Sequence, residues 1–302
     1  MTTGTDAAET DAARRARLAG LACLGITAIG WGLNWPLMKI LLRDWPPLFA
    51  RGVAGVAAAG ILAAIAISRR QSLAIPRAAI PQLLFASFTN VFAWMGMTTV
   101  AMKFISVGEG ALIVYTMPIW TLLLAWPLRG ARPTLRDIAA VLLGLAGVSL
   151  LLGGGGFSFS GERMLGVALS LAAAVLFALG NILNRTPLPL PPFSAVAWQV
   201  GIGCFAMLVL GVAFETPSYQ ALSLTGFACL VYMTLIPMAV CYLTWFATLR
   251  RLPPAGAAAG MLLVPAIATV AAAGVLGEPL GLREVIAIAL TLGGVGLALG
   301  RA

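Results

Sequence analysis

One short apolar stretch, GWGLNWPLMK, carries side chains that a lipid-facing helix does not need. Four of them follow the spacing i, i+3, i+4, i+7, which places them on one helical face: Trp31, Asn34, Trp35 and Met38. An Asn in contact with lipid is costly, so we expect this face to turn inward, toward a cavity. Pro36 weakens the backbone hydrogen bonding around Asn34 and frees carbonyl oxygens that can meet a ligand or water.

A second stretch, FALGNILNR, repeats the pattern with Phe177, Asn181 and Asn184 on one face. These amides can contact a substrate, or they can form hydrogen bonds between helices, and the sequence favours neither. For Trp35, the alternative to a cavity is a place in the aromatic belt at the membrane interface.

Two further apolar segments carry aromatic and polar side chains on one face, and Tyr115 and Thr116 stand just before Pro118. Aromatic stripes are more often packing than ligand sites, but buried polar tips need partners. Because the stripes recur in both halves of the chain, we predict that they line a substrate cavity. Its predicted residues are Trp31, Asn34, Trp35, Asn90, Trp94, Thr98, Tyr115, Phe177, Asn181, Tyr242 and Trp245.

Three charged residues lie close to membrane depth. Lys39 follows the opening stretch by one turn and could meet a substrate carboxylate near the outer mouth. Arg51 and Glu109 lie near the outer ends of their segments and could pair. Glu109 is the one candidate for proton coupling, and its shallow position favours weak coupling or facilitated diffusion. The alternative for all three is interfacial snorkelling or a structural ion pair.

The elements that must position these residues are membrane helices. The chain has 302 residues, of which 61% are hydrophobic and 10% are charged, whereas soluble domains carry roughly 25% charged residues. So little charge cannot cover a water-facing surface, so we expect the bilayer to surround the chain. The net charge is +9, and the basic residues stand in clusters between apolar segments. This arrangement indicates that they set the orientation of the chain in the membrane, and we expect no nucleic-acid partner.

The apolar runs predict an all-α integral membrane protein with ten transmembrane helices. Residues 1–17 are polar, and we expect them to be a disordered cytoplasmic segment without the features of a signal peptide. The expected spans are residues 18–41, 47–67, 78–102, 107–128, 135–153, 164–185, 192–213, 222–249, 255–276 and 282–300.

The distribution of Lys and Arg predicts the orientation of these spans. With a cytoplasmic N-terminus, about 13 basic residues fall on the cytoplasmic side and 5 on the other, as the positive-inside rule requires. We therefore expect a multi-pass protein of a bacterial-type inner (plasma) membrane with both termini in the cytoplasm.

An internal repeat divides the chain. Pro118 and Pro265 align at an offset of 147 residues, and the same offset pairs Arg136 with Arg283, Asp137 with Glu284, and Gly147 with Gly294. Each repeat holds five spans, over residues 18–153 and 164–300, so the two repeats must be inverted in the membrane. Pro118 and Pro265 should kink their helices and act as hinges, or produce static bends.

The segments ALIVYTMPIWTLLLAW and GMLLVPAIATVAAAGVLGEPLGLREVIAIALTLGGVGLAL combine a small-residue helix, a mid-helix Pro, a Gly-Glu-x-Leu turn and a Gly-rich helix. In this order they resemble the drug/metabolite transporter superfamily, EamA type, over about residues 18–300. Ala131 replaces the Glu in the first repeat, so Glu278 is expected to serve docking or capping. The resemblance implies ten helices around a central cavity and cargo such as amino acids, purines, sugars or quaternary amines. Length and aromatic content resemble the YddG-like amino-acid exporters, although no motif forces that choice.

Other classes of function find little support in the residues. The chain has no His, its four Cys lack CxxC spacing, and Gly153–Gly156 is not followed by Gly-Lys-Ser/Thr. We therefore expect no enzyme, no metal and no cofactor, and we see no channel filter. A lipid flippase or a structural membrane protein remains an alternative.

The sequence thus predicts a secondary transporter that exports amino acids, with aromatic or apolar ones favoured, by alternating access. Another small metabolite, such as a purine, a quaternary amine or a sugar-like compound, is the alternative cargo. The expected partners are a small-molecule substrate and the lipid bilayer. We expect a monomer, with a dimer through the Gly-rich helices as the alternative.

Overall fold

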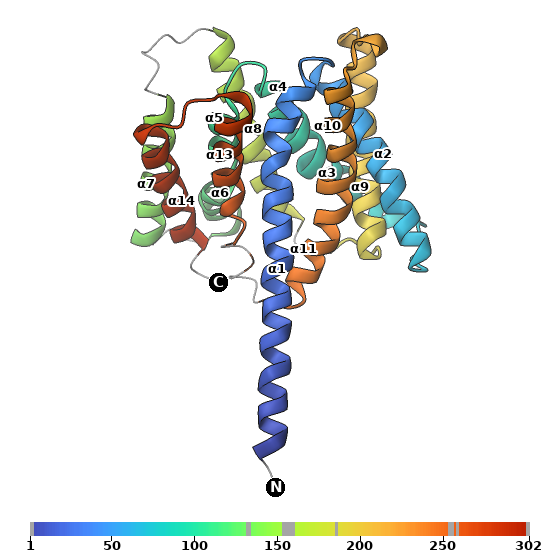
Figure 1. Cartoon of the computed structure of the whole chain (residues 1–302), viewed down its shortest axis with the longest axis vertical. Helices are drawn as coiled ribbons and strands as arrows, with labels where there is room; N and C mark the ends of the chain where they lie inside the picture. Colours follow the sequence, from blue (N-terminus) through green and yellow to red (C-terminus); the bar gives the residue numbers. More distant parts are fainter. Residues whose placement is uncertain are drawn as a thin grey trace.

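The structure is a computed structural model that describes residues 3–130, 134–152, 161–184, 187–252, 257 and 260–299. Within these residues every regular element is a helix and there is no strand, which confirms the all-α expectation. The helices form a bundle from which the first one projects (Figure 1). Ala131 and the run Gly153–Gly156, on which two sequence predictions rest, lie outside the described residues.

The helices of the first half follow the apolar runs closely. They are α1 (Thr3–Leu41), α2 (Pro47–Ser68), η1 (Arg77–Ala79), α3 (Ile80–Ser87), η2 (Phe88–Met97), α4 (Thr98–Ala101), α5 (Val107–Val114), α6 (Met117–Arg129) and α7 (Leu135–Leu152). The helices of the second half are α8 (Gly161–Leu183), α9 (Pro192–Phe214), η4 (Tyr219–Ala221), α10 (Leu224–Leu235), η5 (Ile236–Val240), α11 (Cys241–Leu249), α13 (Leu263–Leu276) and α14 (Leu282–Leu299).

Helix occupies part or all of each segment predicted to span the membrane. Seven helical stretches among the described residues are long and apolar enough to cross a bilayer, by length and composition. Helix α13 is shorter, with 14 residues, and α7 and α14 have 18 residues each. The seven stretches are Arg14–Leu41, Pro47–Ser68, Arg77–Ala101, Val107–Arg129, Gly161–Leu183, Pro192–Phe214 and Leu224–Leu249.

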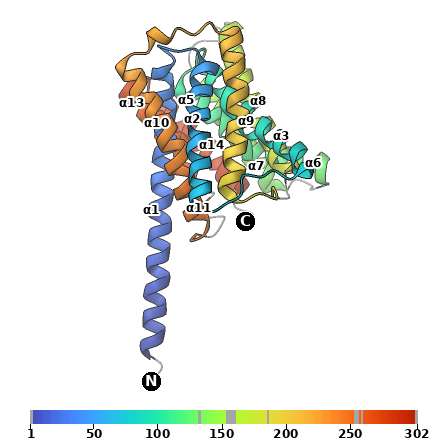
Figure 2. The ribbon, with the colours of Figure 1, turned by 90° about the vertical axis from the view of Figure 1, so that its right-hand side faces the viewer.

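The N-terminal segment differs from the expectation of disorder over residues 1–17. Helix α1 already begins at Thr3 and continues without interruption to Leu41. Its first turns project beyond the rest of the bundle, and both views show this (Figures 1 and 2). The segment DAAETDAARRARLA is rich in Ala and Arg, which are strong helix formers, so it extends the apolar helix that follows.

We call the side from which α1 projects the lower side of the bundle. The opposite, upper edge carries the connections 42–46, 102–106, 215–223 and 277–281 (Figure 1). Helix α14 runs downward from the last of these connections. The first described helix therefore begins on the lower side, and the last described helix ends there.

Two helix pairs, α2 with α9 and α7 with α14, pack over much of their length. Their close approach depends on glycine. A Cβ on Gly52 would overlap the backbone of Leu208, and a Cβ on Gly294 would meet the carbonyl oxygen of Ala140 at 2.6 Å. The Gly-rich faces of α7 and α14 therefore pack against each other inside a single chain.

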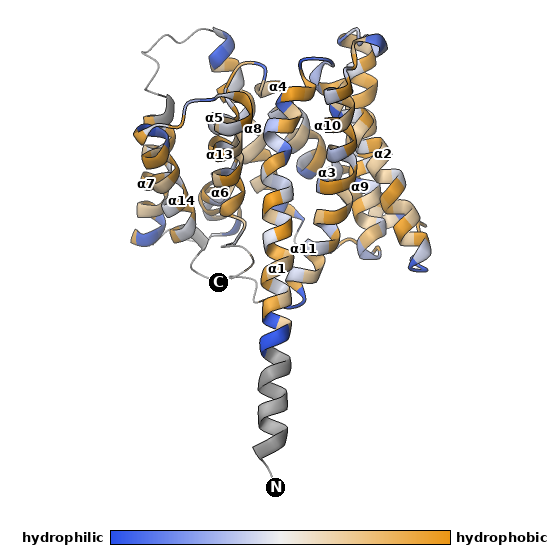
Figure 3. Cartoon of the chain, viewed as in Figure 1, coloured by the Kyte–Doolittle hydropathy of each residue, from blue (hydrophilic) through white to orange (hydrophobic). Residues whose placement is uncertain are grey.

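Large apolar side chains cover the outside of the bundle. Leu142, Phe205, Phe214 and Phe227 are all more than half exposed, and hydrophilic residues gather at the two ends of the helices (Figure 3). A water-facing surface rarely carries so much apolar area, so lipid covers this one. The protein is a multi-pass membrane protein, and its polar groups must find partners inside the bundle.

Candidate functional site

A cavity of about 400 Å³ lies inside the bundle. This volume falls within the range of small-molecule sites, roughly 300–1,000 Å³. It is lined by Trp31, Asn34, Trp35, Met38, Arg51, Asn90, Trp94, Met95, Thr98, Thr99, Met102, Tyr115, Met117, Pro118, Phe177, Pro237, Met238, Tyr242, Trp245, Met261, Leu262 and Val295. These residues come from both halves of the chain.

The structure brings ten of the eleven predicted substrate-site residues together at this cavity. The exception is Asn181, which is exposed on α8 and is not among the lining residues. It lies one turn beyond Phe177 and two residues before the end of the helix. The helix therefore carries this amide past the cavity, and the expectation for Asn181 is wrong in its placement.

The first of two aromatic groups centres on Trp94. Its ring lies 4.5 Å from that of Phe177 at an angle of 44°, and 6.0 Å from that of Tyr115 at 71°. Trp94 belongs to η2, Phe177 to α8, and Tyr115 to the turn between α5 and α6. Tilted and edge-to-face pairs stabilise the contact beyond the burial of area alone, so these three rings form one rigid apolar wall.

The second aromatic group centres on Trp31 of α1. Its ring lies 5.8 Å from Tyr242 at 76° and 6.0 Å from Trp245 at 52°. The indole Nε1 donates a 2.9 Å hydrogen bond to the carbonyl oxygen of Pro237. This bond fixes the ring in one orientation, because a buried indole N–H needs an acceptor.

Both aromatic groups depend on irregular helix. Segments η2 and η5 are π-helical, and Trp94, Pro237 and Met238 all lie in them. Pro237 cannot donate a backbone hydrogen bond, which favours a local departure from regular α-helix there. π-Helical segments recur at functional sites because they alter the helical register. Here they coincide with residues that line the cavity.

Two amides of the cavity have different environments. Asn90 donates from Nδ2 to Oε1 of Gln199 at 3.4 Å, and its Oδ1 accepts from the hydroxyl of Thr89 at 3.3 Å. The Oδ1 of Asn34 is buried and has no hydrogen-bond partner among the described residues. Asn90 thus connects helices, whereas the oxygen of Asn34 does not.

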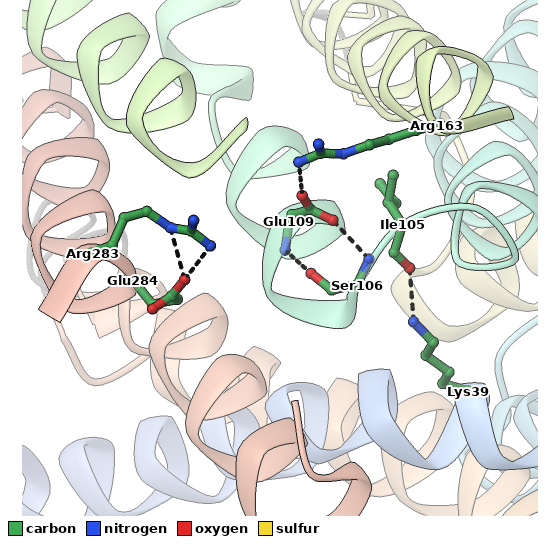
Figure 4. A network of polar contacts seen from close by, with 7 residues as sticks. All are labelled: Lys39, Ile105, Ser106, Glu109, Arg163, Arg283 and Glu284. Atoms are coloured by element: carbon green, nitrogen blue, oxygen red, sulfur yellow. Dashed lines mark hydrogen bonds and ion pairs between the residues drawn. The ribbon is translucent and has the colours of Figure 1, made fainter. Parts of the chain in front are cut away.

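Arg51 is the one charged residue among the described residues that line the cavity. It lies in the second turn of α2, is 5% exposed, and its Nε and Nη1 have no hydrogen-bond partner in the described part of the chain. The pair with Glu109 that the sequence allowed is not formed. Glu109 instead pairs with Arg163 at 2.7 Å (Figure 4).

Glu109 is held in place at the upper edge by its own helix as well. Its Oε2 accepts from the backbone N–H of Ser106 at 2.9 Å, and its own N–H donates to Oγ of Ser106 at 3.1 Å (Figure 4). This capping box begins α5. Glu109 does not line the cavity.

Lys39 also lies at the upper edge and outside the cavity lining. Its Nζ donates to the carbonyl oxygen of Ile105 at 2.8 Å (Figure 4) and to Oε1 of Glu278 at 3.2 Å. The carboxylate of Glu278 also accepts from the backbone N–H groups of Val107 at 2.9 Å and Gly108 at 3.3 Å. Glu278 therefore docks the α13–α14 connection onto the first turn of α5, the docking role that the sequence predicts. We call Lys39, Glu109, Arg163 and Glu278 the rim network.

The two predicted hinge prolines lie close to helix breaks. Pro118 lines the cavity, and the helix is interrupted just before it, at Tyr115 and Thr116. Pro265 is buried in the first turn of α13, after a turn at Met261 and Leu262, and does not line the cavity.

Methionines are the main group of lining residues that the sequence prediction left out. Six of them line the cavity: Met38, Met95, Met102, Met117, Met238 and Met261. Met in an apolar helix is ordinary core material, so type alone gave no signal. Met38 lies on the face of Trp31 that was predicted to turn inward, although it was not among the predicted site residues, and spacing could also have found Met238, which precedes Tyr242 by four residues.

Helices around an aromatic cavity, with lipid on the outside, define a class of protein: a multi-pass membrane protein with an internal site for a small molecule. A family model described as the EamA-like transporter family matches residues 18–153 and 164–300. The chain belongs to this family, and it is a membrane transporter.

Several curated proteins are similar over most of the chain. The "uncharacterized transporter YvbV" of Bacillus subtilis (strain 168) is 28% identical over 263 residues, which cover 86% of this chain and 84% of that protein. A "probable amino-acid metabolite efflux pump" of Salmonella typhimurium is 27% identical over 282 residues, covering 89% and 91%. A "probable terminal-alkyne amino-acid exporter" of Streptantibioticus cattleyicolor is 25% identical over 268 residues, covering 84% of each.

A solved crystal structure of a protein matches the fold with a TM-score of 0.65 and 23% sequence identity. The match covers 94% of this chain and 96% of that one. At this identity the likeness extends to the fold alone.

Proposed function

We infer that this transporter exports amino acids, with aromatic or apolar ones favoured, by alternating access. The observation that carries this inference is the cavity of about 400 Å³ with aromatic groups from both halves of the chain. Aromatic and Met side chains suit an apolar or aromatic side chain of a substrate. Two similar proteins named for amino-acid efflux and export support the same cargo.

Alternating access follows from an inverted pair of five-helix repeats, which we propose for residues 18–153 and 164–300. The same capping bond occurs at the repeat offset in both. The backbone N–H of Thr134 donates to Asp137 Oδ2 at 2.7 Å, and that of Gly281 donates to Glu284 Oε2 at 2.8 Å. These bonds begin α7 and α14, so corresponding residues serve corresponding helices.

The packing of whole helices supports the same repeat. Helix α1 packs against α13 and against the broken helix formed by η5 and α11. Its counterpart α8 makes the corresponding contacts, with α5 and α6 and with the broken helix formed by η2 and α4. The pairs α2–α9 and α7–α14 join corresponding helices of the two repeats. Such a pseudo-symmetric bundle has two related closed states, one toward each side of the membrane. The helix breaks before Pro118 and Pro265 are the proposed hinges between them.

The proposed orientation places the lower side in the cytoplasm of a bacterial-type inner membrane, with both termini there. The lower ends of α2 and α11 carry Arg69, Arg70, Arg250 and Arg251, which the positive-inside rule assigns to the cytoplasm. The rim network then lies on the outer side. We propose a monomer, because the Gly-rich faces of α7 and α14 pack against each other within the chain.

Transport by this protein is proposed to be facilitated diffusion or only weakly coupled to protons. The residues that line the cavity include no Asp or Glu, and the sequence has no His. Glu109, the one coupling candidate from the sequence, instead forms an ion pair with Arg163 and caps the N-terminus of α5. A proton-coupled carrier instead needs a titratable group that faces the substrate path.

Uptake into proteoliposomes of purified protein tests the proposed function. A panel of labelled amino acids is offered with and without an imposed pH gradient. Saturable flux of aromatic or apolar amino acids, with competition among them, is the expected result. Flux of a purine, a quaternary amine or a sugar-like compound in place of any amino acid would move the cargo to another class, and lipid scrambling alone would indicate a flippase.

A further inference from the structure

The cavity contains a buried cation, Arg51, two of whose nitrogens have no hydrogen-bond partner among the described residues. Arg51 is 5% exposed, and two of its three side-chain nitrogens, Nε and Nη1, are buried without a hydrogen-bond acceptor among the described residues. An unpaired guanidinium inside a membrane protein is costly to maintain, because burial removes its hydration and no carboxylate of the described residues compensates for this loss. A charge in this state marks a place where another molecule supplies the acceptor.

Other arginines of the bundle show what a structural arginine does here. Arg163 pairs with Glu109 at 2.7 Å, and Arg129 donates from Nη2 to the carbonyl oxygen of Ile182. Both have acceptors supplied by the chain itself. Arg51 differs from them because it faces a cavity large enough for a small molecule, and because no described residue that lines this cavity carries a negative charge.

A second unpartnered atom of opposite character lines the same cavity. Asn34 Oδ1 is buried and accepts no hydrogen bond from the described residues. Arg51 therefore offers donors and a positive charge, while Asn34 offers an acceptor. A molecule that carries an anionic acceptor group and a cationic donor group can bind both the Arg51 nitrogens and the Asn34 oxygen. A plain apolar ligand can bind neither.

We propose that Arg51 binds the carboxylate of the substrate and that Asn34 Oδ1 accepts a hydrogen bond from its ammonium group. This assignment rests on the proposed function, because it treats the cavity as the transport site. It makes a free carboxylate the feature that all substrates share. The side chain of the substrate then lies against the aromatic groups of Trp31 and Trp94, where size and apolar character decide preference.

Arginine suits this role better than lysine does. Its planar guanidinium forms directed, charge-assisted hydrogen bonds with a carboxylate and keeps its charge under all conditions in which proteins are folded. Loss of one partner from a desolvated charge pair costs enough to reduce affinity by at least about 30-fold. Arg51 should therefore discriminate between molecules that differ in the carboxylate alone.

A competition series on the wild-type protein tests the assignment without any variant. Uptake of labelled L-phenylalanine into proteoliposomes is challenged with L-phenylalanine, its methyl ester, phenethylamine and 3-phenylpropionate. L-phenylalanine should compete at least about 30-fold better than its methyl ester or phenethylamine, both of which lack the free carboxylate. It should also compete better than 3-phenylpropionate, which lacks the ammonium group. Equal competition by the ester and the amine would overturn the role of Arg51, and equal competition by the propionate would overturn that of Asn34.

Two variants of one helix provide the matched comparison. Arg51→Gln should abolish most L-phenylalanine uptake and remove the preference for L-phenylalanine over its methyl ester. Arg51→Lys should retain only part of the wild-type uptake. Arg69→Gln changes the same residue type at the C-terminal cap of α2, at an exposed position over the ring of Phe193 and outside the cavity lining. It should leave uptake and preference unchanged, and thermal unfolding of each purified variant shows whether it folds.

The outcomes separate this inference from the proposed function. If the wild-type protein carries no amino acid, the proposed function fails first. If it carries L-phenylalanine and the methyl ester equally well, or if folded Arg51→Gln keeps the wild-type preference, the protein is an amino-acid carrier but Arg51 is not the carboxylate anchor.

Discussion

The rim network and the cavity both contain charged residues, but they treat charge in opposite ways. At the rim, Lys39 and Glu109 have ionic and backbone partners supplied by the chain. In the cavity, Arg51 has two nitrogens without an acceptor in the described residues. Charges with protein partners fix helix ends and connections, whereas a charge without one is available to a ligand. The two regions should therefore respond differently to the same kind of substitution.

The largest effect is expected in the wall of the cavity. Trp94→Ala removes the contacts with Phe177 and Tyr115, and transport efficiency should fall about 10- to 100-fold because apolar and ring contacts with the substrate are lost. Initial rates of uptake into proteoliposomes measure this. Trp126→Ala is the control, since Trp126 is 55% exposed on α6 and faces away from the cavity. Equal loss in both variants would mean that Trp94 only packs.

A rim substitution should change stability instead of affinity. Glu278→Gln weakens the contacts with Lys39 and with the N-terminus of α5, so the free energy of unfolding should fall by about 1–3 kcal/mol. Thermal unfolding of the purified protein measures this, and Glu162→Gln, at an exposed position in the first turn of α8, is the control. A large change in substrate affinity with unchanged stability would contradict the structural role of the rim.

A smaller effect is expected for a substitution of Lys39, the ionic partner of Glu278. Lys39→Gln removes a pair whose lysine side chain is 29% exposed, and partly exposed pairs contribute under about 1 kcal/mol. The variant should unfold at nearly the wild-type temperature and transport at nearly the wild-type rate. A severe loss of transport would instead place Lys39 on the substrate path, as the sequence alone allowed.

The smallest effect should come from pH. The sequence has no His, and the cavity lining has no acidic residue, so initial rates should change less than about twofold between about pH 6 and 8. The rates are measured at equal substrate concentration with and without a gradient. Flux that requires the gradient would direct attention back to Glu109 and its ion pair with Arg163.

Local spacing placed ten of the eleven predicted substrate-site residues at the cavity. The faces with Trp31 and Trp94 could be read from i, i+3 and i+4 intervals, and their recurrence in both halves separated them from ordinary packing. Asn181 failed because the helix carries it beyond the cavity, and Met261 and Val295 gave no signal because their types are common in any apolar helix. Helix positions could be predicted because they follow the apolar runs.

Which charges meet could not be predicted from the sequence. Glu109 met Arg163 instead of Arg51, and Lys39 met Glu278, which lies 239 residues away. Such pairs depend on how helices pack across the two halves, and spacing within one helix does not contain that information. The π-helical segments η2 and η5 also escaped prediction, because their altered register arises where the helices meet around the cavity.

The most direct test of the account compares one substitution of each region in a single experiment. Arg51→Gln and Glu278→Gln are purified side by side, and both L-phenylalanine affinity and thermal unfolding are measured. We expect Arg51→Gln to lose affinity while it stays folded, and Glu278→Gln to lose stability while it keeps its affinity. If both variants lose affinity and stability to the same degree, the distinction between partnered and unpartnered charge is wrong.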